Sequence, residues 1–154
     1  MNRVFFPRDE YFMRLALREA ERALEHDDVP IGCVIAHDGE VVAAAGNERE
    51  VRGDPTAYAE VLALREASRA LGGWRLTGTA MYVTLEPCAM CAGAIVLARV
   101  PRVVYGAPDP KAGAAGSVVD VLGEPHLNHR PEVSEGLLAE ECTELLRRFF
   151  ALRR

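Results

Sequence analysis

The stretch AMYVTLEPCAMCAGAIVLARVPRVVYGA, residues 80 to 107, predicts the centre of the fold. Residues 80–85 form a short apolar run that is typical of a buried strand. Residues 87–100 begin with a proline, which suits the first turn of a helix, and residues 102–107 are a second strand-like run. A strand, a helix and a strand in this order form a crossover between parallel strands, which is nearly always right-handed.

Two elements are predicted before this unit. Residues 9–26 carry apolar groups at helical spacing, and residues 31–46 contain two β-rich runs on either side of Asp38 and Gly39. The apolar stripe of the helix is Met13, Ala16, Leu17, Ala20, Ala23 and Leu24. The Asp-Gly pair is a strong hairpin signal, so we expect the two strands to be antiparallel neighbours.

A second helix is predicted from Asp54 to Leu71. Asp54 is a favoured N-cap residue, and Pro55 suits the first helical position. The inner face of this helix is predicted to be Ala57, Val61, Leu64, Ser68 and Leu71. Glu60 then lies near the helix start among small and apolar neighbours.

The rest of the chain contains a glycine-rich loop at residues 108–117, a short apolar turn at residues 118–122 and a last helix from about Glu135 to the C-terminus. Helices on both faces of a mixed sheet give an α/β fold, a three-layer α/β/α sandwich. Neither an internal repeat nor a low-complexity linker interrupts the sequence, so residues 1–154 are predicted to form a single domain.

Composition and charge are those of an ordinary soluble protein. Hydrophobic residues make up 49% of the 154 residues, and the formal net charge is −5. No apolar run is long enough to span a bilayer and the N-terminus lacks a signal-peptide pattern, so we expect a cytoplasmic protein without a membrane partner. Arginines and phenylalanines gather at residues 147–154, where they either complement the end of a helix or contact a nucleic acid. The charge pattern alone favours the first.

Cys88 and Cys91 are the close pair among the four cysteines, while Cys33 and Cys142 lie in runs that predict burial. The pair is spaced i, i+3 at a predicted helix start, where unpaired amides and the helix dipole favour the thiolate. Such a pair fits half of a zinc site, a redox dithiol or two buried cysteines that are close by chance. The residues between them lack the tryptophan and proline of thioredoxin-type pairs, which disfavours the redox dithiol.

Zinc deaminases combine the pattern His-x-Glu with Pro-Cys-x-x-Cys, and the glutamate moves protons without being a zinc ligand. The second half is present here as Pro87, Cys88 and Cys91, and the first half reads Tyr-Ala-Glu at residues 58–60. By position alone Glu60 is a solvent-exposed carboxylate that complements the dipole of its helix. The combined pattern favours a proton-transfer group beside a metal ion.

Further segments extend this pattern along the chain. They are VPIG at residues 29–32, GN at 46–47, DPTA at 54–57, VTLEPCAMCAGAI at 83–95, RVVYGA at 102–107, GAAGSVVDVL at 113–122, LNHRPEV at 127–133 and GLLAEEC at 136–142. With these segments the chain resembles the bacterial tRNA-specific adenosine deaminases over nearly its whole length. The glycine-rich loop and the LNHR segment distinguish this branch from guanine, cytosine and cytidine deaminases, which share only the metal-binding pattern.

The resemblance implies a cytidine-deaminase-like fold with a mixed five-stranded sheet, a homodimer and one Zn²⁺ per subunit. The implied reaction is hydrolytic deamination of adenosine to inosine at the wobble position of a tRNA anticodon, which makes the anticodon stem-loop the partner. Cys88 and Cys91 match two zinc ligands, and Glu60 matches the residue that moves protons between water and the adenine ring. Asn47 matches a position that hydrogen-bonds the flipped nucleotide, whereas its local sequence alone predicts a turn residue.

Tyr58 departs from the family pattern, in which this position holds a histidine that is the third zinc ligand. The phenol oxygen lies farther from the main chain than an imidazole nitrogen, and it must lose a proton whose pKa is about 10 in model peptides. Three interpretations are open: an impaired deaminase, which we favour; a zinc site completed by the phenolate, a water molecule, His37 or His129; and a catalytically inactive tRNA-binding relative. A deaminase of the same superfamily that acts on a free base such as guanine is the alternative reaction.

Overall fold

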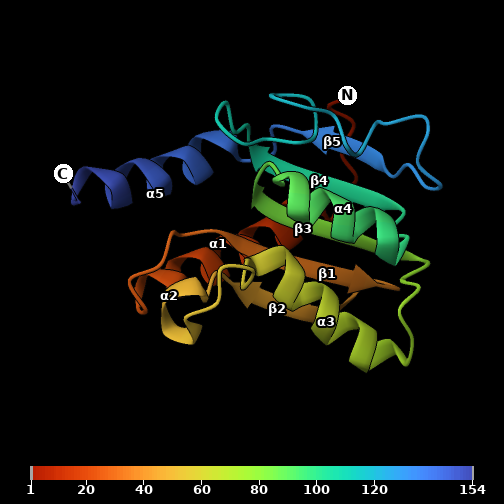
Figure 1. Cartoon of the computed structure of the whole chain (residues 1–154), viewed down its shortest axis with the longest axis horizontal. Coiled ribbons are helices and arrows are strands. Elements are labelled where there is room, and N and C mark those ends of the chain that lie inside the picture. Colours follow the sequence, from red (N-terminus) through yellow and green to blue (C-terminus); the bar gives the residue numbers. More distant parts are fainter. Residues whose placement is uncertain (1, 154) are drawn as a thin grey trace.

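The computed structural model describes residues 2–153, in which a five-stranded sheet has helices on both faces (Figure 1). The strands are β1 (Gly32–His37), β2 (Glu40–Gly46), β3 (Thr79–Leu85), β4 (Arg102–Ala107) and β5 (Glu132–Glu135), in the spatial order β2-β1-β3-β4-β5. β1 is antiparallel to β2 and β3, whereas β4 is parallel to β3 and β5. The predicted mixed sheet and the parallel crossover within residues 80–107 are therefore confirmed.

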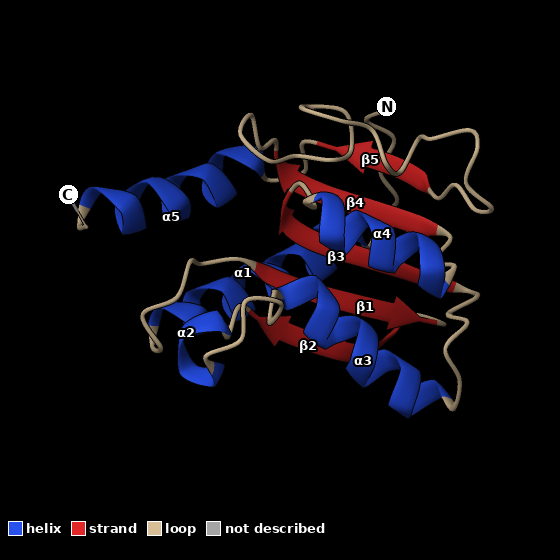
Figure 2. Cartoon of the chain, in the orientation of Figure 1, coloured by secondary structure: helices blue, strands red, loops and turns tan. Residues whose placement is uncertain are grey.

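Helices α3 (Ala59–Leu71) and α4 (Ala89–Ala98) cover one face of the sheet, and α1 (Asp9–Leu24) and α5 (Ala139–Ala151) lie on the other (Figure 2). Successive side chains of a strand point to opposite faces. Cys33 and Ile35 of β1 accordingly join the core under α3 and α4, and Val34 between them joins the core under α1. The predicted stripe of α1 is buried except at its last residue, Leu24. This confirms the three-layer sandwich.

The predicted hairpin joins β1 to β2. Asp38 and Gly39 both have positive φ angles, 51° and 78°, as a two-residue turn of the type favoured in hairpins requires. The strands pair antiparallel from Gly32 opposite Gly46 to His37 opposite Glu40. β2 therefore ends at Gly46, directly before Asn47.

The second predicted helix begins at Ala59, and its predicted start at Asp54 was wrong. The carboxylate of Asp54 instead accepts hydrogen bonds from the N–H and the hydroxyl of Thr56, which makes a local turn. A short helix that the sequence pattern did not indicate, α2 (Arg49–Arg52), precedes this turn. The buried residues of α3 are Ala59, Glu60, Leu62, Ala63, Leu64 and Ala67. Of the predicted inner face, Ala57 and Leu64 are buried, whereas Val61, Ser68 and Leu71 are not.

The C-terminal region differs from the sequence prediction at its strand. Glu135, where the last helix was expected to begin, is the final residue of β5, and α5 begins at Ala139. β5 pairs with β4 across the long loop that follows Ala107, a contact that local sequence does not encode. Arg154, the last residue of the RRFFALRR segment, lies outside the described residues. No helix within residues 2–153 is long and apolar enough to cross a membrane.

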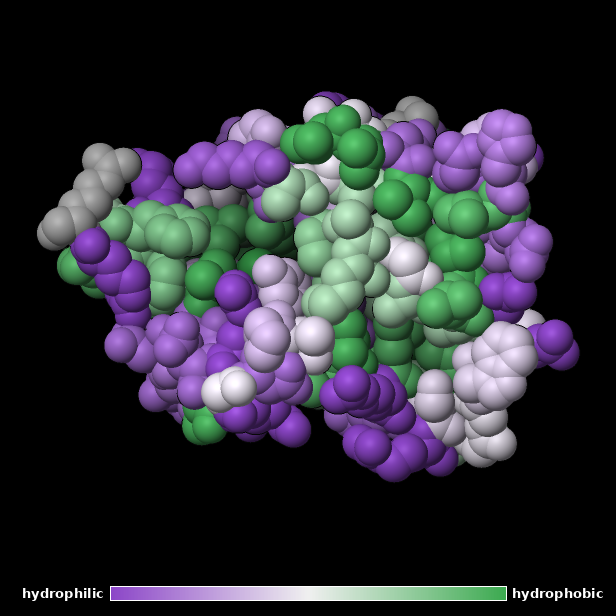
Figure 3. All heavy atoms as spheres, viewed as in Figure 1, coloured by the Kyte–Doolittle hydropathy of each residue, from purple (hydrophilic) through white to green (hydrophobic). Residues whose placement is uncertain are grey.

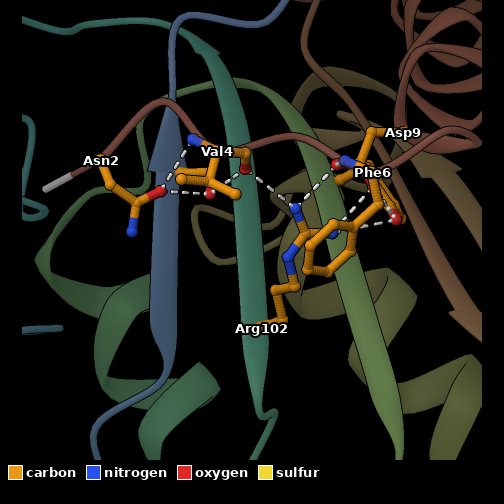
Figure 4. A network of polar contacts seen from close by, with 7 residues as sticks. Asn2, Val4, Phe6, Asp9 and Arg102 are labelled. Carbon is orange, nitrogen blue, oxygen red and sulfur yellow. Dashed lines mark hydrogen bonds and ion pairs between the residues drawn. The ribbon is translucent and has the colours of Figure 1, made fainter.

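The N-terminal segment lies against the sheet through a buried ion pair. Arg102 of β4 donates hydrogen bonds to the carboxylate of Asp9 at 2.8 and 2.7 Å and to the carbonyl oxygen of Val4 at 3.3 Å (Figure 4). The side chain of Asn2 accepts a hydrogen bond from Ser134 of β5. The start of the chain is thus fixed to β4 and β5.

Candidate active site

A pocket of about 440 Å³ is lined by the N-terminal ends of α3 and α4 and by the end of β3. Tyr58, Glu60 and Cys88 line it directly. Cys91 and Asn47 lie next to them, since Cys91 is hydrogen-bonded to Cys88 and Asn47 to the first residue of α3. The fold therefore gathers all the residues that the sequence singled out as a site.

Cys88 is the N-cap residue of α4, and Cys91 lies in the first turn of this helix. The Cys91 thiol and the main-chain N–H groups of Met90 and Cys91 favour the negative charge on the Cys88 sulfur. These contacts lower the pKa of Cys88 to about 6 and raise the pKa of Cys91. At neutral pH Cys88 is therefore a thiolate, which is the form that binds a metal ion.

Glu60 is a buried carboxylate in the first turn of α3, with only 2% of its surface exposed. Its Oε1 atom has no hydrogen-bond partner within the described residues. The pKa of Glu60 is raised to about 7, mainly by burial and also by the negative charge of Cys88, although a hydrogen bond from its own main-chain N–H lowers it. The solvent-exposed interpretation of this residue is excluded, and the carboxyl group can both take up and release a proton near neutral pH.

Tyr58 is the N-cap residue of α3, with an extended main chain (φ −77°, ψ 150°). Its half-buried ring lines the pocket, and the guanidinium carbon of Arg49 lies 4.8 Å from the ring centroid. Burial raises the pKa of the Tyr58 phenol above its ordinary value, more than the nearby Arg49 lowers it. The phenol is consequently protonated at neutral pH and offers a neutral oxygen atom to the pocket.

Asn47 follows β2 and is completely buried. Its side-chain carbonyl oxygen accepts the N–H of Ala59 at 2.8 Å and so caps α3 from outside the helix. Its Nδ2 atom is buried without a partner in the part of the chain that the structure describes. The turn-stabilising interpretation explains the oxygen of this amide and leaves its N–H groups for another partner.

Two protein atoms beside the pocket are suitable zinc ligands, the sulfurs of Cys88 and Cys91. Among residues 2–153 no group of three His, Cys, Asp or Glu side chains could hold a metal ion. His129 is hydrogen-bonded to a main-chain carbonyl oxygen at 2.6 Å, His37 lies 3.5 Å from a neighbouring aspartate, and neither lines the pocket. The third protein position is left to the neutral phenol of Tyr58, so the fit is incomplete.

Arg49, Phe150 and Glu86 also line the pocket, and none of them was predicted as a site residue. Arg49 belongs to α2 and has a buried Nε atom that lacks a partner among the described residues, and Phe150 comes from α5. Glu86 follows β3 and is 2% exposed. Although burial alone would raise its pKa, hydrogen bonds from Ser117 and from loop amides hold it below the ordinary value. Only Glu86 could have been noticed, as a carboxylate that directly follows an apolar strand.

Comparison with known proteins places the fold and the pocket in one family. A sequence profile described as the cytidine and deoxycytidylate deaminase zinc-binding region matches residues 7–107. The chain is 51% identical over 142 residues to a tRNA-specific adenosine deaminase of Bacillus subtilis, covering 92% of this chain and 88% of that protein. It is 50% identical over 144 residues to one of Agrobacterium fabrum, with 94% and 95% covered.

A solved structure gives the same result in three dimensions. It comes from biochemical and structural studies of A-to-I editing by tRNA:A34 deaminases at the wobble position of transfer RNA. It is 50% identical to this chain, covers 88% of this chain and 99% of its own length, and matches with a TM-score of 0.85. The predicted cytidine-deaminase-like fold is confirmed, and the chain belongs to the tRNA-specific adenosine deaminases, a family of hydrolases within the cytidine and deoxycytidylate deaminase superfamily.

Proposed function

We propose that this chain converts adenosine to inosine at the wobble position of a tRNA anticodon, with water consumed and ammonia released. The observation that carries the proposal is the pocket, in which the buried carboxylate of Glu60 lies beside the thiolate of Cys88. Relatives that are 50% and 51% identical are tRNA-specific adenosine deaminases, which favours this substrate over a free base such as guanine. The proposed partner is therefore the anticodon stem-loop.

Each residue of the pocket has a proposed role. Cys88 and Cys91 would hold one Zn²⁺ per subunit, and zinc supplies a water molecule of lowered pKa in such sites. Glu60 takes a proton from water and delivers it to the adenine ring, for which a pKa of about 7 is suitable. Asn47 donates its unpaired N–H groups to the flipped nucleotide while its oxygen caps α3.

Tyr58 is proposed to occupy the position of the third zinc ligand and to impair the enzyme. A neutral phenol is a poor ligand, because the phenolate forms only when a proton with a raised pKa is lost. Loss of residues that merely orient zinc ligands weakens metal binding by about 10- to 100-fold, and loss of a ligand should cost more. The chain then binds zinc weakly and has little activity.

A second copy of the chain is proposed to cover the exposed face of α3 and α4. Apolar side chains lie across this face, over α4 (Figure 3), where Leu97 is 69% exposed and the nearby Trp74 is 57% exposed. An exposed apolar patch of this kind marks an interaction surface. Leu97→Glu should convert a dimer to a monomer in light scattering after size exclusion, and a parent chain that is already monomeric would refute the homodimer.

The test of the function compares the chain with two substitutions at Tyr58. Zinc content is measured by elemental analysis, and inosine formation is measured on an anticodon stem-loop RNA. Tyr58→His should raise zinc content to about one per subunit and restore inosine formation, since it supplies the missing nitrogen ligand. Tyr58→Phe is the matched control, because it keeps the ring and removes only the oxygen.

Each arm has an outcome that contradicts part of the proposal. If Tyr58→Phe loses zinc that the parent holds, the phenol oxygen is a working ligand and the chain is not impaired in the way proposed. If Tyr58→His takes up zinc and makes no inosine, the deaminase assignment fails. RNA binding by a Tyr58→His protein that is also inactive would support a catalytically inactive tRNA-binding relative.

A further inference from the structure

Glu86 is a buried carboxylate that has no part in the chemistry proposed above. It lies between β3 and α4, two positions before Cys88, and is 2% exposed. Its main-chain N–H donates to the carbonyl oxygen of Ala107 at 2.9 Å. A carboxylate that is buried at an edge of the pocket requires partners, and they come from the glycine-rich loop.

Four donors of this loop converge on the Glu86 carboxylate. Oε1 accepts the N–H of Asp109 at 3.0 Å and the hydroxyl of Ser117, and Oε2 accepts the N–H groups of Ala115 at 2.9 Å and Ser117 at 3.1 Å. A Cβ atom on Gly113 would lie 2.4 Å from the carboxyl carbon of Glu86. The loop main chain is therefore folded directly over the carboxylate, at a distance that only glycine allows.

The part of the loop between these donors is a wall of the pocket. Residues 108–112 all line the pocket, together with Glu86 itself. Glu86 binds this segment at Asp109 and again beyond it at Ala115 and Ser117, so that the anchor holds both ends. The neighbouring carbonyl oxygen of Pro87 accepts the N–H of Ala114 at 2.8 Å, which ties the same loop to the turn that leads into α4.

We propose that Glu86 is a positioning residue that sets the affinity of the pocket for its substrate. Its carboxylate fixes the wall formed by residues 108–112 relative to Cys88 and Glu60, and it does not touch the reacting atoms. This inference rests on the proposed function for the identity of the substrate. The effect of Glu86 on the loop can be measured without enzymatic turnover.

Glu86→Gln is the variant that tests this role in the full-length chain. Glutamine keeps the shape of the side chain but replaces one acceptor oxygen with an NH₂ group, which cannot accept the loop N–H groups. Amide hydrogen exchange in residues 109–117 should rise by about tenfold or more, because at least one amide loses its partner. The dissociation constant for an anticodon stem-loop RNA should rise about five- to tenfold, whereas zinc content should stay at the parent value.

Two further variants separate positioning from a general loss of stability. Asp120→Asn alters another carboxylate that accepts a main-chain N–H, that of Gly123, and it does not line the pocket, so RNA affinity should be unchanged. Ser117→Ala removes only one of the four donors, the hydroxyl group. Amide exchange in the loop and the dissociation constant for RNA should therefore rise, but less than in Glu86→Gln. This variant remains informative if Glu86→Gln folds poorly. In a Tyr58→His background, Glu86→Gln should raise KM and change kcat less than about twofold.

The outcomes distinguish this inference from the proposed function. Unchanged exchange in Glu86→Gln would overturn the anchor, and faster exchange with unchanged RNA affinity and KM would overturn the positioning role. A fall in kcat without a change in KM would also overturn the positioning role, since Glu86 would then affect the chemical step and not substrate binding. If neither the parent nor Tyr58→His binds the stem-loop, the proposed function is wrong. The tRNA anticodon is then also wrong as the substrate that the wall of residues 108–112 positions.

Discussion

Replacing Asp9 with asparagine should lower the free energy of unfolding by about 3 to 5 kcal/mol, the range measured when one partner of a buried ion pair is removed. The carboxylate of Asp9 is 2% exposed and accepts four hydrogen bonds. Two come from the guanidinium of Arg102, one from the hydroxyl of Tyr82 at 2.7 Å and one from the main-chain N–H of Phe6 at 2.6 Å. Asparagine keeps the size of the side chain but has a single acceptor oxygen.

The cost arises mainly at the partner that remains. The side chain of Arg102 is 11% exposed, and its other contacts are the carbonyl oxygen of Val4, the hydroxyl of Tyr82 at 3.5 Å and the ring of Phe6 at 4.1 Å (Figure 4). Without the carboxylate its positive charge is buried and uncompensated. For a chain of this size 1 kcal/mol corresponds to about 2–4 °C in Tm, so that Tm should fall by about 6–20 °C in thermal unfolding followed by circular dichroism.

The neighbouring residue provides the control, and pH provides a second test. Glu10 forms an exposed ion pair with Arg14, so Glu10→Gln should cost less than about 1 kcal/mol. Burial alone would raise the pKa of Asp9, but hydrogen bonds from Arg102, Phe6 and Tyr82 lower it below the ordinary value. The stabilisation is therefore complete above pH of about 4, the unfolded pKa, and is lost as the pH falls through the lower folded pKa. A difference between parent and Asp9→Asn that is no larger than for Glu10→Gln, or that grows on acidification, would refute the reasoning.

Three other predictions concern the thiols, the core and the RNA partner. In the metal-free chain, alkylation of Cys88 by iodoacetamide should follow a titration with a midpoint near the pKa of about 6, and a midpoint above 8 would contradict the thiolate. Gly32→Ala should abolish or strongly destabilise folding, because its Cβ would lie 1.9 Å from a carbonyl oxygen of α1, whereas Gly93→Ala meets no atom within 4 Å and should raise Tm or leave it unchanged. Neutral substitutions at Arg147 and Arg148 should weaken tRNA binding and flatten its salt dependence, and an unchanged salt slope would remove α5 from the RNA interface.

The parts of the fold that the sequence predicts correctly are those with strong local periodicity or turn chemistry. The run at residues 80–107 contains both parallel strands and the helix between them, and Asp38 and Gly39 specify the hairpin. The errors occur where a distant residue decides the local structure. Ala59 begins α3 because its N–H is bound by Asn47 from the end of β2, and the local N-cap signal at Asp54 is used in a turn instead.

The site is predictable to a similar extent and for the same reason. The pattern that marks Tyr58, Glu60, Cys88 and Cys91 follows from their spacing at two helix starts, and the fold brings these starts to one pocket. Arg49 could not be found, since its place over the ring of Tyr58 depends on how α2 packs. The parts of the pocket wall that come from α5 and from the loop after β4 could not be predicted. They depend on tertiary contacts of residues that lie far in the sequence from the two helix starts.

The two helices that begin at the pocket, α3 and α4, lack the usual capping hydrogen bond from the side chain of the N-cap residue. Their N-cap residues, Tyr58 and Cys88, make no side-chain capping hydrogen bond, although a favoured cap contributes about 1 kcal/mol. An N-cap side-chain oxygen would accept hydrogen bonds from the main-chain N–H groups that face the pocket. Those N–H groups could then no longer stabilise charged groups in the pocket. At α4 the amides favour the charge on the Cys88 sulfur, and at α3 the buried Asn47 supplies the acceptor from outside the helix. Because the cap of α3 does not depend on residue 58, Tyr58→His can change the metal donors of the pocket and leave the start of the helix in place.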